Sequence, residues 1–175
     1  MSGSSDAVEL VDYDPSWATL FEQERARLAT VFDGRVVAIE HIGSTSVPGL
    51  SAKPIVDVLV GLDRLELWDD HIETMQRLGY EYLGEYGLPG RLFFRNHDPH
   101  THNVHVVEHD GEHWNRQLAF RDALRADPEE RRRYDELKRR LAAEGHTRDV
   151  YTELKTPFIR EVEARARARD VGPSS

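Results

Sequence analysis

The stretch from residue 41 to residue 62, HIGSTSVPGLSAKPIVDVLVGL, holds the side chains best suited to chemistry. A Gly-Ser-Thr turn at residues 43–45 precedes Lys53, and Asp57 follows inside an apolar run. An ionised carboxylate among apolar residues is costly unless it is paired or binds a metal ion. Asp57 is therefore the first candidate for a catalytic carboxylate or a metal ligand, and Lys53 is the candidate basic partner.

The turn is a candidate phosphate site, although it is not a Walker A loop. That loop carries its lysine directly after its second glycine, whereas here Leu50 follows Gly49. A strand that ends at Gly43 and turns into a short helical segment leaves backbone N–H groups free to bind phosphate. Ser44 and Thr45 add hydroxyl donors. Taken alone, the turn is better explained as an ordinary helix cap.

Basic side chains offer the positive charge that a phosphate site needs. Lys53 lies between the turn and the aspartate strand, where its ammonium would contact phosphate or neutralise Asp57. Arg91 and Arg95 flank the strand-like LFF, and their even spacing directs both side chains to one side. Guanidinium groups bind phosphate through paired hydrogen bonds, so both arginines are candidate phosphate ligands.

The C-terminal part of the chain adds two more candidates on expected helices. Arg121 either binds phosphate or forms an internal ion pair with Asp122. Lys155, in the sequence YTELK, would close the pocket from the last helix. The charged run PEERRRYDELKRR at residues 128–140 is interpreted as a solvated helix face with salt bridges along it.

Six of the nine histidines lie between residues 97 and 113. If NVHVVE forms a strand, Asn103 and His105 share one of its faces. His105 is a candidate metal ligand, because imidazole suits transition metals such as zinc. The alternative is that His105 is a hydrogen-bonded histidine of the core.

Composition limits the class of protein. The chain has 175 residues, no cysteine and a formal net charge of −9. One domain over residues 1–175 is expected, with an ordered core at about 11–168. Disulfides, thiolate metal sites and cysteine nucleophiles are excluded, and the acidic charge argues against a nucleic-acid partner. Short apolar runs and an N-terminus unlike a signal peptide predict no membrane partner and a cytoplasmic location.

Periodicity predicts the order helix, strand, turn, strand, helix, hairpin, strand and three helices. The first two helices are expected at residues 14–32 and 63–79, the second capped by Asp63, and the strands at 36–43, 53–62, 80–87, 90–96 and 102–111. Trp17, Trp68 and Trp114 are assigned to the core. The expected fold is α+β (mixed α/β), with a small mixed sheet flanked by helices and a helical C-terminal layer.

Three blocks, HIGSTSVPGLSAKPIVDVLV, LAFRDALRADPEERRRYDELKRRLA and YTELKTPFI, resemble the GrpB family in the same order, from about Val11 to Ala168. The resemblance implies the nucleotidyltransferase superfamily, with a sheet like the palm of DNA polymerase β. It also implies that Gly43 and Ser44 form the phosphate turn and that Asp57 is the first catalytic carboxylate. The second carboxylate of that superfamily lies two residues further on, where this chain has Leu59. The histidine strand is implied to lie next to Asp57, so that Asp57 and His105 would bind a divalent metal, a pair that suits zinc or manganese better than magnesium alone.

These observations predict a protein that binds a nucleotide or another phosphorylated small molecule with a divalent metal (Mg, Mn or Zn). If it is active, it transfers a nucleotidyl group to a small metabolite. One alternative is a non-catalytic ligand-binding module that lacks the second carboxylate, which Leu59 favours. The other is a metal-dependent phosphohydrolase that uses Asp57 and His105.

Overall fold

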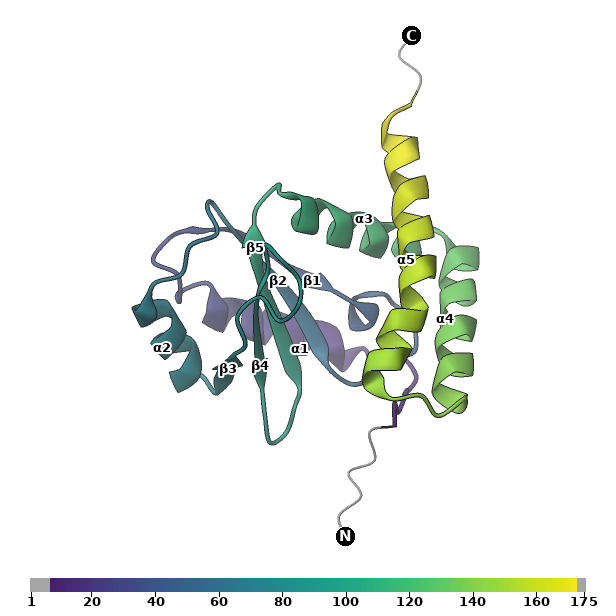
Figure 1. The fold of residues 1–175 in the computed structure, drawn as a ribbon, viewed down its shortest axis with the longest axis horizontal. Helices are drawn as coiled ribbons and strands as arrows, with labels where there is room; N and C mark the ends of the chain where they lie inside the picture. Colours follow the sequence, from purple (N-terminus) through teal and green to yellow (C-terminus); the bar gives the residue numbers. More distant parts are fainter. Residues whose placement is uncertain (1–6, 173–175) are drawn as a thin grey trace.

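The computed structural model describes residues 7–172 (Figure 1). The elements follow the expected order, and the α+β class is confirmed. They are α1 (Ser16–Leu28), β1 (Val36–Ile42), the short 3-10 helix η1 (Ser44–Ser46), β2 (Val56–Leu62), α2 (Asp69–Arg77), β3 (Tyr80–Tyr82), β4 (Leu92–Asn96), β5 (His102–Glu108), α3 (Glu112–Ala126), α4 (Pro128–Ala143) and α5 (Arg148–Asp170).

The five strands form one mixed sheet in the order β1-β2-β5-β4-β3. β2 and β5 run parallel, and the other neighbouring pairs are antiparallel. β2 lies between β1 and β5, so the beginning of β2 meets the end of β1 and the beginning of β5. Asp57 is accordingly paired with Ile42 on one side and with Asn103 on the other. This pairing brings the turn that follows β1 next to Asp57.

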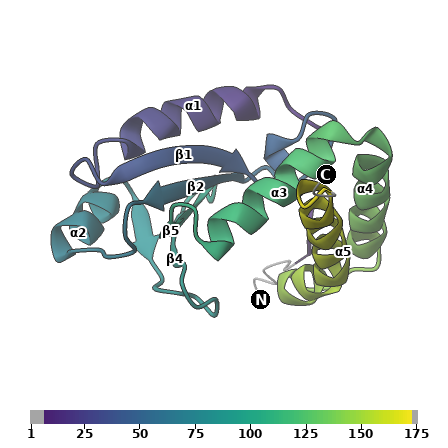
Figure 2. The same cartoon turned by 90° about the horizontal axis from the view of Figure 1, so that it is seen from above.

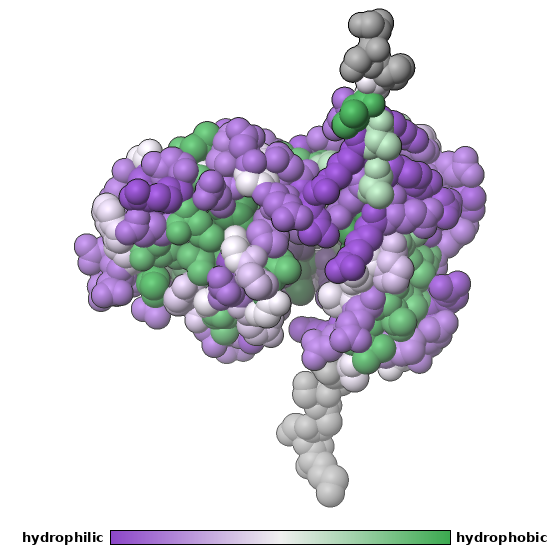
Figure 3. All heavy atoms as spheres, turned by 45° about the horizontal axis from the view of Figure 1, so that its top comes forward, coloured by the Kyte–Doolittle hydropathy of each residue, from purple (hydrophilic) through white to green (hydrophobic). Residues whose placement is uncertain are grey.

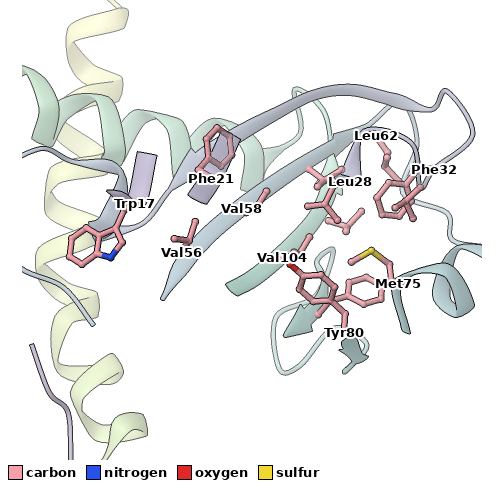
Figure 4. Close-up of a cluster of buried hydrophobic side chains, with 14 of the residues drawn as sticks. Trp17, Phe21, Leu28, Phe32, Val56, Val58, Leu62, Met75, Tyr80 and Val104 are labelled. Atoms are coloured by element: carbon pink, nitrogen blue, oxygen red, sulfur yellow. The ribbon is translucent and has the colours of Figure 1, made fainter. Parts of the chain in front are cut away.

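β2 alternates between two environments, as a strand with both faces covered must. Its even-numbered residues join the largest hydrophobic cluster, together with side chains of α1 and α2 (Figure 4). Leu28 and Phe32 are fully buried in this cluster. Each such side chain stabilises the fold by about 1.5–3 kcal/mol. The odd-numbered residues Asp57 and Leu59 face the other side of the sheet.

α3 lies across the side of the sheet opposite α1, and α4 and α5 pack against α3 beyond the end of the sheet (Figure 2). Trp114 of α3 packs against Leu59, so α3 covers part of this sheet face. α4 begins at Pro128, and the Asp127 carboxylate caps it by accepting hydrogen bonds from two backbone N–H groups. No helix within residues 7–172 is long and apolar enough to cross a bilayer.

The second helix begins later than the sequence predicts. It starts at Asp69 and not at residue 63, and the residue preceding it is Trp68, not Asp63. The guanidinium of Arg35 donates hydrogen bonds to backbone carbonyls of the 63–68 segment, which holds that segment outside the helix. The prediction that Trp68 belongs to the core is wrong: it is 50% exposed and stacks on His71 at the surface.

Candidate functional site

Asp57 is held by two hydrogen-bond donors from the neighbouring strand. Its Oδ1 accepts a hydrogen bond from Asn103 Nδ2 and another from His105 Nε2, each at 3.1 Å. Both donors lie on β5 at alternate positions, so they face the same side as Asp57. The His105 ring is packed in turn against Phe93 of β4, with 5.1 Å between the centroids. The carboxylate therefore has a fixed position on the sheet.

The surroundings of Asp57 keep it ionised. Burial by itself would raise the pKa of Asp57, but the hydrogen bond and field of His105, the hydrogen bond from Asn103 and the ammonium of Lys53 outweigh burial. The pKa of Asp57 is consequently held below its ordinary value. At neutral pH the side chain carries a negative charge and acts as an acceptor.

Position 43 requires glycine for two reasons, its backbone conformation and the closeness of Asp57. Its φ of +73° lies in the left-handed region that favours glycine. A Cβ built at this position would lie 2.6 Å from Asp57 Oδ2. The backbone of the turn thus approaches the second carboxylate oxygen more closely than any other residue type would allow. The backbone of the turn therefore packs directly against the Asp57 carboxylate.

The turn is anchored from the helical layer by a buried lysine. Lys138 of α4 donates a hydrogen bond to Ser44 Oγ at 2.8 Å and another to the backbone carbonyl of Ser51. Behind the turn, Thr45 Oγ1 is hydrogen-bonded to His41 Nε2 at 2.9 Å. Ser44 therefore faces α4 and the cavity, whereas the hydroxyl of Thr45 is engaged with β1.

All three lysines of the chain line one cavity with Asp57 and the turn. Lys53 precedes β2, Lys138 comes from α4 and Lys155 comes from α5. Lys53 and Lys155 lie near the same aromatic ring, with Nζ 5.6 Å and 4.3 Å from the Tyr151 centroid. Among the described residues, no carboxylate forms an ion pair with any of the three lysines at the 4.0 Å limit. The three lysines therefore lack a close ion-pair partner among the described residues, although the Asp57 charge favours the charged forms of Lys53 and Lys155.

Burial and mutual repulsion lower the proton affinity of these lysines. Burial first, and the Lys155 charge second, lower the pKa of Lys138 to about 7. Burial and the Lys53 charge lower the pKa of Lys155 to about 8, although Asp57 acts in the opposite direction. The pKa of Lys53 is also lowered, chiefly by burial. A bound anion would reverse these shifts by stabilising the charged forms.

The cavity has a volume of about 410 Å³, within the range of small-molecule sites. It opens between the sheet and α5, where the surface is hollowed (Figure 3). Phe120, Tyr134 and Ile159 supply apolar wall. Two buried nitrogen atoms of lining residues, Arg91 Nε and His105 Nδ1, have no hydrogen-bond partner. Buried polar groups are normally satisfied, so these two atoms are exceptions next to the cavity.

Most of the residues proposed from the sequence converge on this cavity. Eight of them line it, namely Gly43, Ser44, Thr45, Lys53, Asp57, Arg91, His105 and Lys155. Arg95 and Arg121 do not. Arg95 contacts Glu81 on the neighbouring strand, with Nε and Oε2 3.6 Å apart. Arg121 donates to Glu40 at 2.7 Å and to Asp122 at 2.9 Å, so its role is to tie α3 to β1.

Lys138 is the main residue that sequence reasoning missed. It was assigned to a solvated helix face, but it is only 1% exposed. Tyr134 and Leu141 of the same helix are buried as well. The spacing 134, 138 and 141 follows the helical period and could have indicated an inward face within the charged run. A lysine is seldom fully buried, so its presence on such a face indicates a specific role.

The protein groups alone do not complete a metal site. Residues 7–172 contain no group of three or more His, Cys, Asp or Glu side chains that could hold a metal ion. His105 uses Nε2 to bind Asp57, and Leu59 is buried under α3. One carboxylate does fit the way magnesium binds together with substrate phosphates and water. Any cation here would therefore need oxygen atoms from a bound ligand.

A mixed five-stranded sheet that carries a Gly-Ser turn beside an aspartate is consistent with the nucleotidyltransferase superfamily. The chain belongs to the GrpB family: residues 7–165 match the model of the family described as GrpB protein. The crystal structure of conserved protein GrpB from Enterococcus faecalis has a TM-score of 0.85 and 39% identity, and the match covers 92% of this chain and 98% of that chain.

Curated relatives agree with this assignment. Glutamate-rich protein GrpB of Alkalihalophilus pseudofirmus is 35% identical over 89% of this chain and 93% of its own length. UPF0157 protein YqkA of Bacillus subtilis is 39% identical over 91% of this chain, which spans only 47% of that protein. A dephospho-CoA kinase of Mycolicibacterium paratuberculosis is 29% identical over 91% of this chain and 46% of its own length. The chain thus spans about half the length of the latter two relatives.

Proposed function

We propose that this protein binds a nucleotide or another phosphorylated small molecule in the lysine-lined cavity, as a cytoplasmic protein. The observation that carries the proposal is the convergence of Lys53, Lys138 and Lys155 on one cavity with no carboxylate paired to them. Three lysines grouped around the single carboxylate of Asp57 repel one another, and a negatively charged ligand would relieve this repulsion. Phosphate groups have the necessary charge and acceptor oxygens.

The turn and the lysines would bind the phosphates directly, and Asp57 would bind them through a cation. Backbone N–H groups after Gly43 and the Ser44 hydroxyl offer neutral donors, while Lys53 and Lys155 offer charge. Asp57 would take part through a divalent cation that enters with the ligand, because phosphate oxygens would complete the coordination sphere. Such a cation would neutralise charge between the carboxylate and the phosphates.

A binding role is favoured over two-metal transfer chemistry by Leu59. This residue is 1% exposed and packs with Ile42 and Trp114, so its position offers neither an oxygen ligand nor space for a second ion. The dephospho-CoA kinase relative is compatible with a nucleotide-related role but does not choose between binding and catalysis.

The test removes the two lysines that form no hydrogen bond and compares them with a cation outside the cavity. The double variant Lys53→Met/Lys155→Met should bind ATP at least about 100-fold more weakly by isothermal titration calorimetry, since each charged hydrogen bond contributes roughly 1.5–3 kcal/mol. Arg132→Met removes an exposed charge of α4 and should leave the affinity unchanged. The melting temperature of the unliganded double variant should be equal to that of the wild type or higher, because a repulsive pair has been removed.

The same titrations identify the chemistry. Binding of ribonucleoside triphosphates without turnover supports the proposal. Release of pyrophosphate would show a nucleotidyltransferase, and release of phosphate alone would show a phosphohydrolase. If neither triphosphates nor inorganic tripolyphosphate bind at millimolar concentration, the lysine cluster does not serve phosphate and the proposal is wrong.

A further inference from the structure

Tyr86 is an exposed aromatic side chain on the wall of the lysine-lined cavity. It lies in the loop between β3 and β4, and 56% of it is exposed. The same cavity contains Asp57 and Lys155. Ligand sites combine a few charged groups with aromatic wall, and the lysine cluster accounts only for the charged part. Phosphate binding by itself gives the Tyr86 ring no role.

The loop holds Tyr86 in an uncommon backbone conformation. Its φ is +50°, in the left-handed region that residues other than glycine seldom occupy. Arg91 stabilises this conformation, because its Nη2 donates to the carbonyl oxygens of Glu85 and Tyr86 at 3.1 Å each. Arg91 also lines the cavity. A strained position that the surrounding structure enforces is typical of a functional site.

One face of the Tyr86 ring is supported from below by β4. The ring stacks on Phe93 with 5.3 Å between centroids and an interplanar angle of 17°. The guanidinium of Arg95 lies 5.9 Å from the Tyr86 centroid. Phe93 thus covers part of the ring from β4, and 56% of the Tyr86 side chain remains exposed, so ring surface is open to a ligand.

The ring is also linked to the carboxylate by a short series of contacts. Tyr86 stacks on Phe93, Phe93 packs on His105, and His105 donates to Asp57 at 3.1 Å. The exposed ring therefore lies on the sheet side of the cavity, and Lys155 lies across from it on α5. A ligand that fills the cavity would meet an aromatic surface at one wall and ammonium groups at the other.

We propose that the exposed part of the Tyr86 ring stacks against a planar heterocyclic ring, so that the ligand is a nucleotide and not a simpler phosphorylated metabolite. This inference rests on the proposed phosphate-binding function and adds the part of the ligand that phosphate binding does not specify. The base lies on Tyr86 while the phosphates reach the lysines and the turn. Stacking on one tyrosine accepts any base, since every base has a π face.

The experiment separates the ring of the ligand from its phosphates. Isothermal titration calorimetry measures the affinity of the full chain for the four ribonucleoside triphosphates and for inorganic tripolyphosphate. The wild type should bind at least one nucleoside triphosphate about 5- to 150-fold more tightly than tripolyphosphate, which corresponds to roughly 1–3 kcal/mol of stacking. Tyr86→Ala should remove this advantage and leave the affinity for tripolyphosphate within about twofold.

Two variants control for the aromatic ring and for the loop. Tyr86→Phe keeps the ring and should retain the nucleotide affinity. Leu88→Ala removes a side chain of the same loop that is 37% exposed and does not line the cavity, and it should change neither affinity. Because tripolyphosphate binding reports an intact cavity, a misfolded Tyr86→Ala protein would be recognised by the loss of both ligands, and Tyr86→Ser would then replace it.

The outcomes distinguish base stacking on Tyr86 from phosphate binding in the cavity. If the wild type binds tripolyphosphate as tightly as every nucleoside triphosphate, or if Tyr86→Ala retains the nucleotide advantage, the base does not stack on Tyr86. The phosphate site would survive that result. If the wild type binds neither class of ligand, the phosphate site itself is wrong.

Discussion

The lowered pKa of Lys155 makes ligand affinity depend on pH in a way that can be calculated. Burial and the Lys53 charge lower the pKa of Lys155 to about 8. If phosphate binds only the ammonium form, the apparent dissociation constant equals the intrinsic one divided by the protonated fraction. That fraction falls from about 0.9 at pH 7 to about 0.1 at pH 9, so affinity should fall about tenfold. A lysine with an ordinary pKa would change it by only a few per cent.

The assay compares the wild type with Lys155→Arg by titrating ATP between pH 7 and pH 9. Terminal phosphates ionise for the second time near pH 6, so the charge of the ligand is almost constant over this range. Arginine stays protonated. Lys138, with its pKa of about 7, contributes a pH dependence common to both proteins. The wild type should lose about tenfold more affinity than Lys155→Arg across the range. Equal slopes would refute the assignment of Lys155 to the phosphate site.

The same lowered pKa gives stability the opposite pH dependence. Between about pH 8, where Lys155 titrates in the folded protein, and its reference value of 10.5, the unfolded chain binds more protons than the folded one. The free energy of unfolding of the unliganded protein should therefore rise with pH through this window. Chemical denaturation at pH 8 and pH 10 measures it. The gain in unfolding free energy from pH 8 to pH 10 should be larger for the wild type than for Lys155→Arg. A smaller gain in the wild type would contradict the lowered pKa of Lys155.

Three further predictions concern the turn, the covered strand and the cation. Gly43→Ala and Gly145→Ala both place a Cβ at a positive φ, which costs about 1–2 kcal/mol. Only the Cβ at position 43 would lie 2.6 Å from Asp57 Oδ2. Calorimetry should therefore show weaker ATP binding for Gly43→Ala and unchanged binding for Gly145→Ala. Leu59→Asp should lose at least about 3 kcal/mol of stability by urea denaturation, because the carboxylate would be buried against Ile42 and Trp114, and wild-type stability would mean that the position has room for an ion. Magnesium should strengthen ATP binding in the wild type and not in Asp57→Asn; equal strengthening would place the cation elsewhere.

Local sequence determined most of the secondary structure and half of the site. The alternation of β2, the isolation of Asp57 within it and the glycine at position 43 were all visible, because strand period and backbone sterics depend on neighbouring residues. Alternation on β5 put Asn103 and His105 on one face, whereas the contact of His105 with Asp57 depends on β5 lying beside β2 in the sheet. The start of α2 could not be predicted from its own residues. The hydrogen bonds that hold residues 63–68 outside the helix come from Arg35, about thirty residues earlier in the chain.

The tertiary structure alone decided which charged residues serve the cavity. Lys138 and Ser44 lie 94 residues apart in the sequence, and only the docking of α4 makes the lysine a partner of the turn. Arg121 fits a phosphate site by type, yet Glu40 lies close enough to bind it. Tyr86 faces the cavity because β4 supports it. Charge interactions act through space, and composition and period carry no information about which distant carboxylate or aromatic ring will be adjacent.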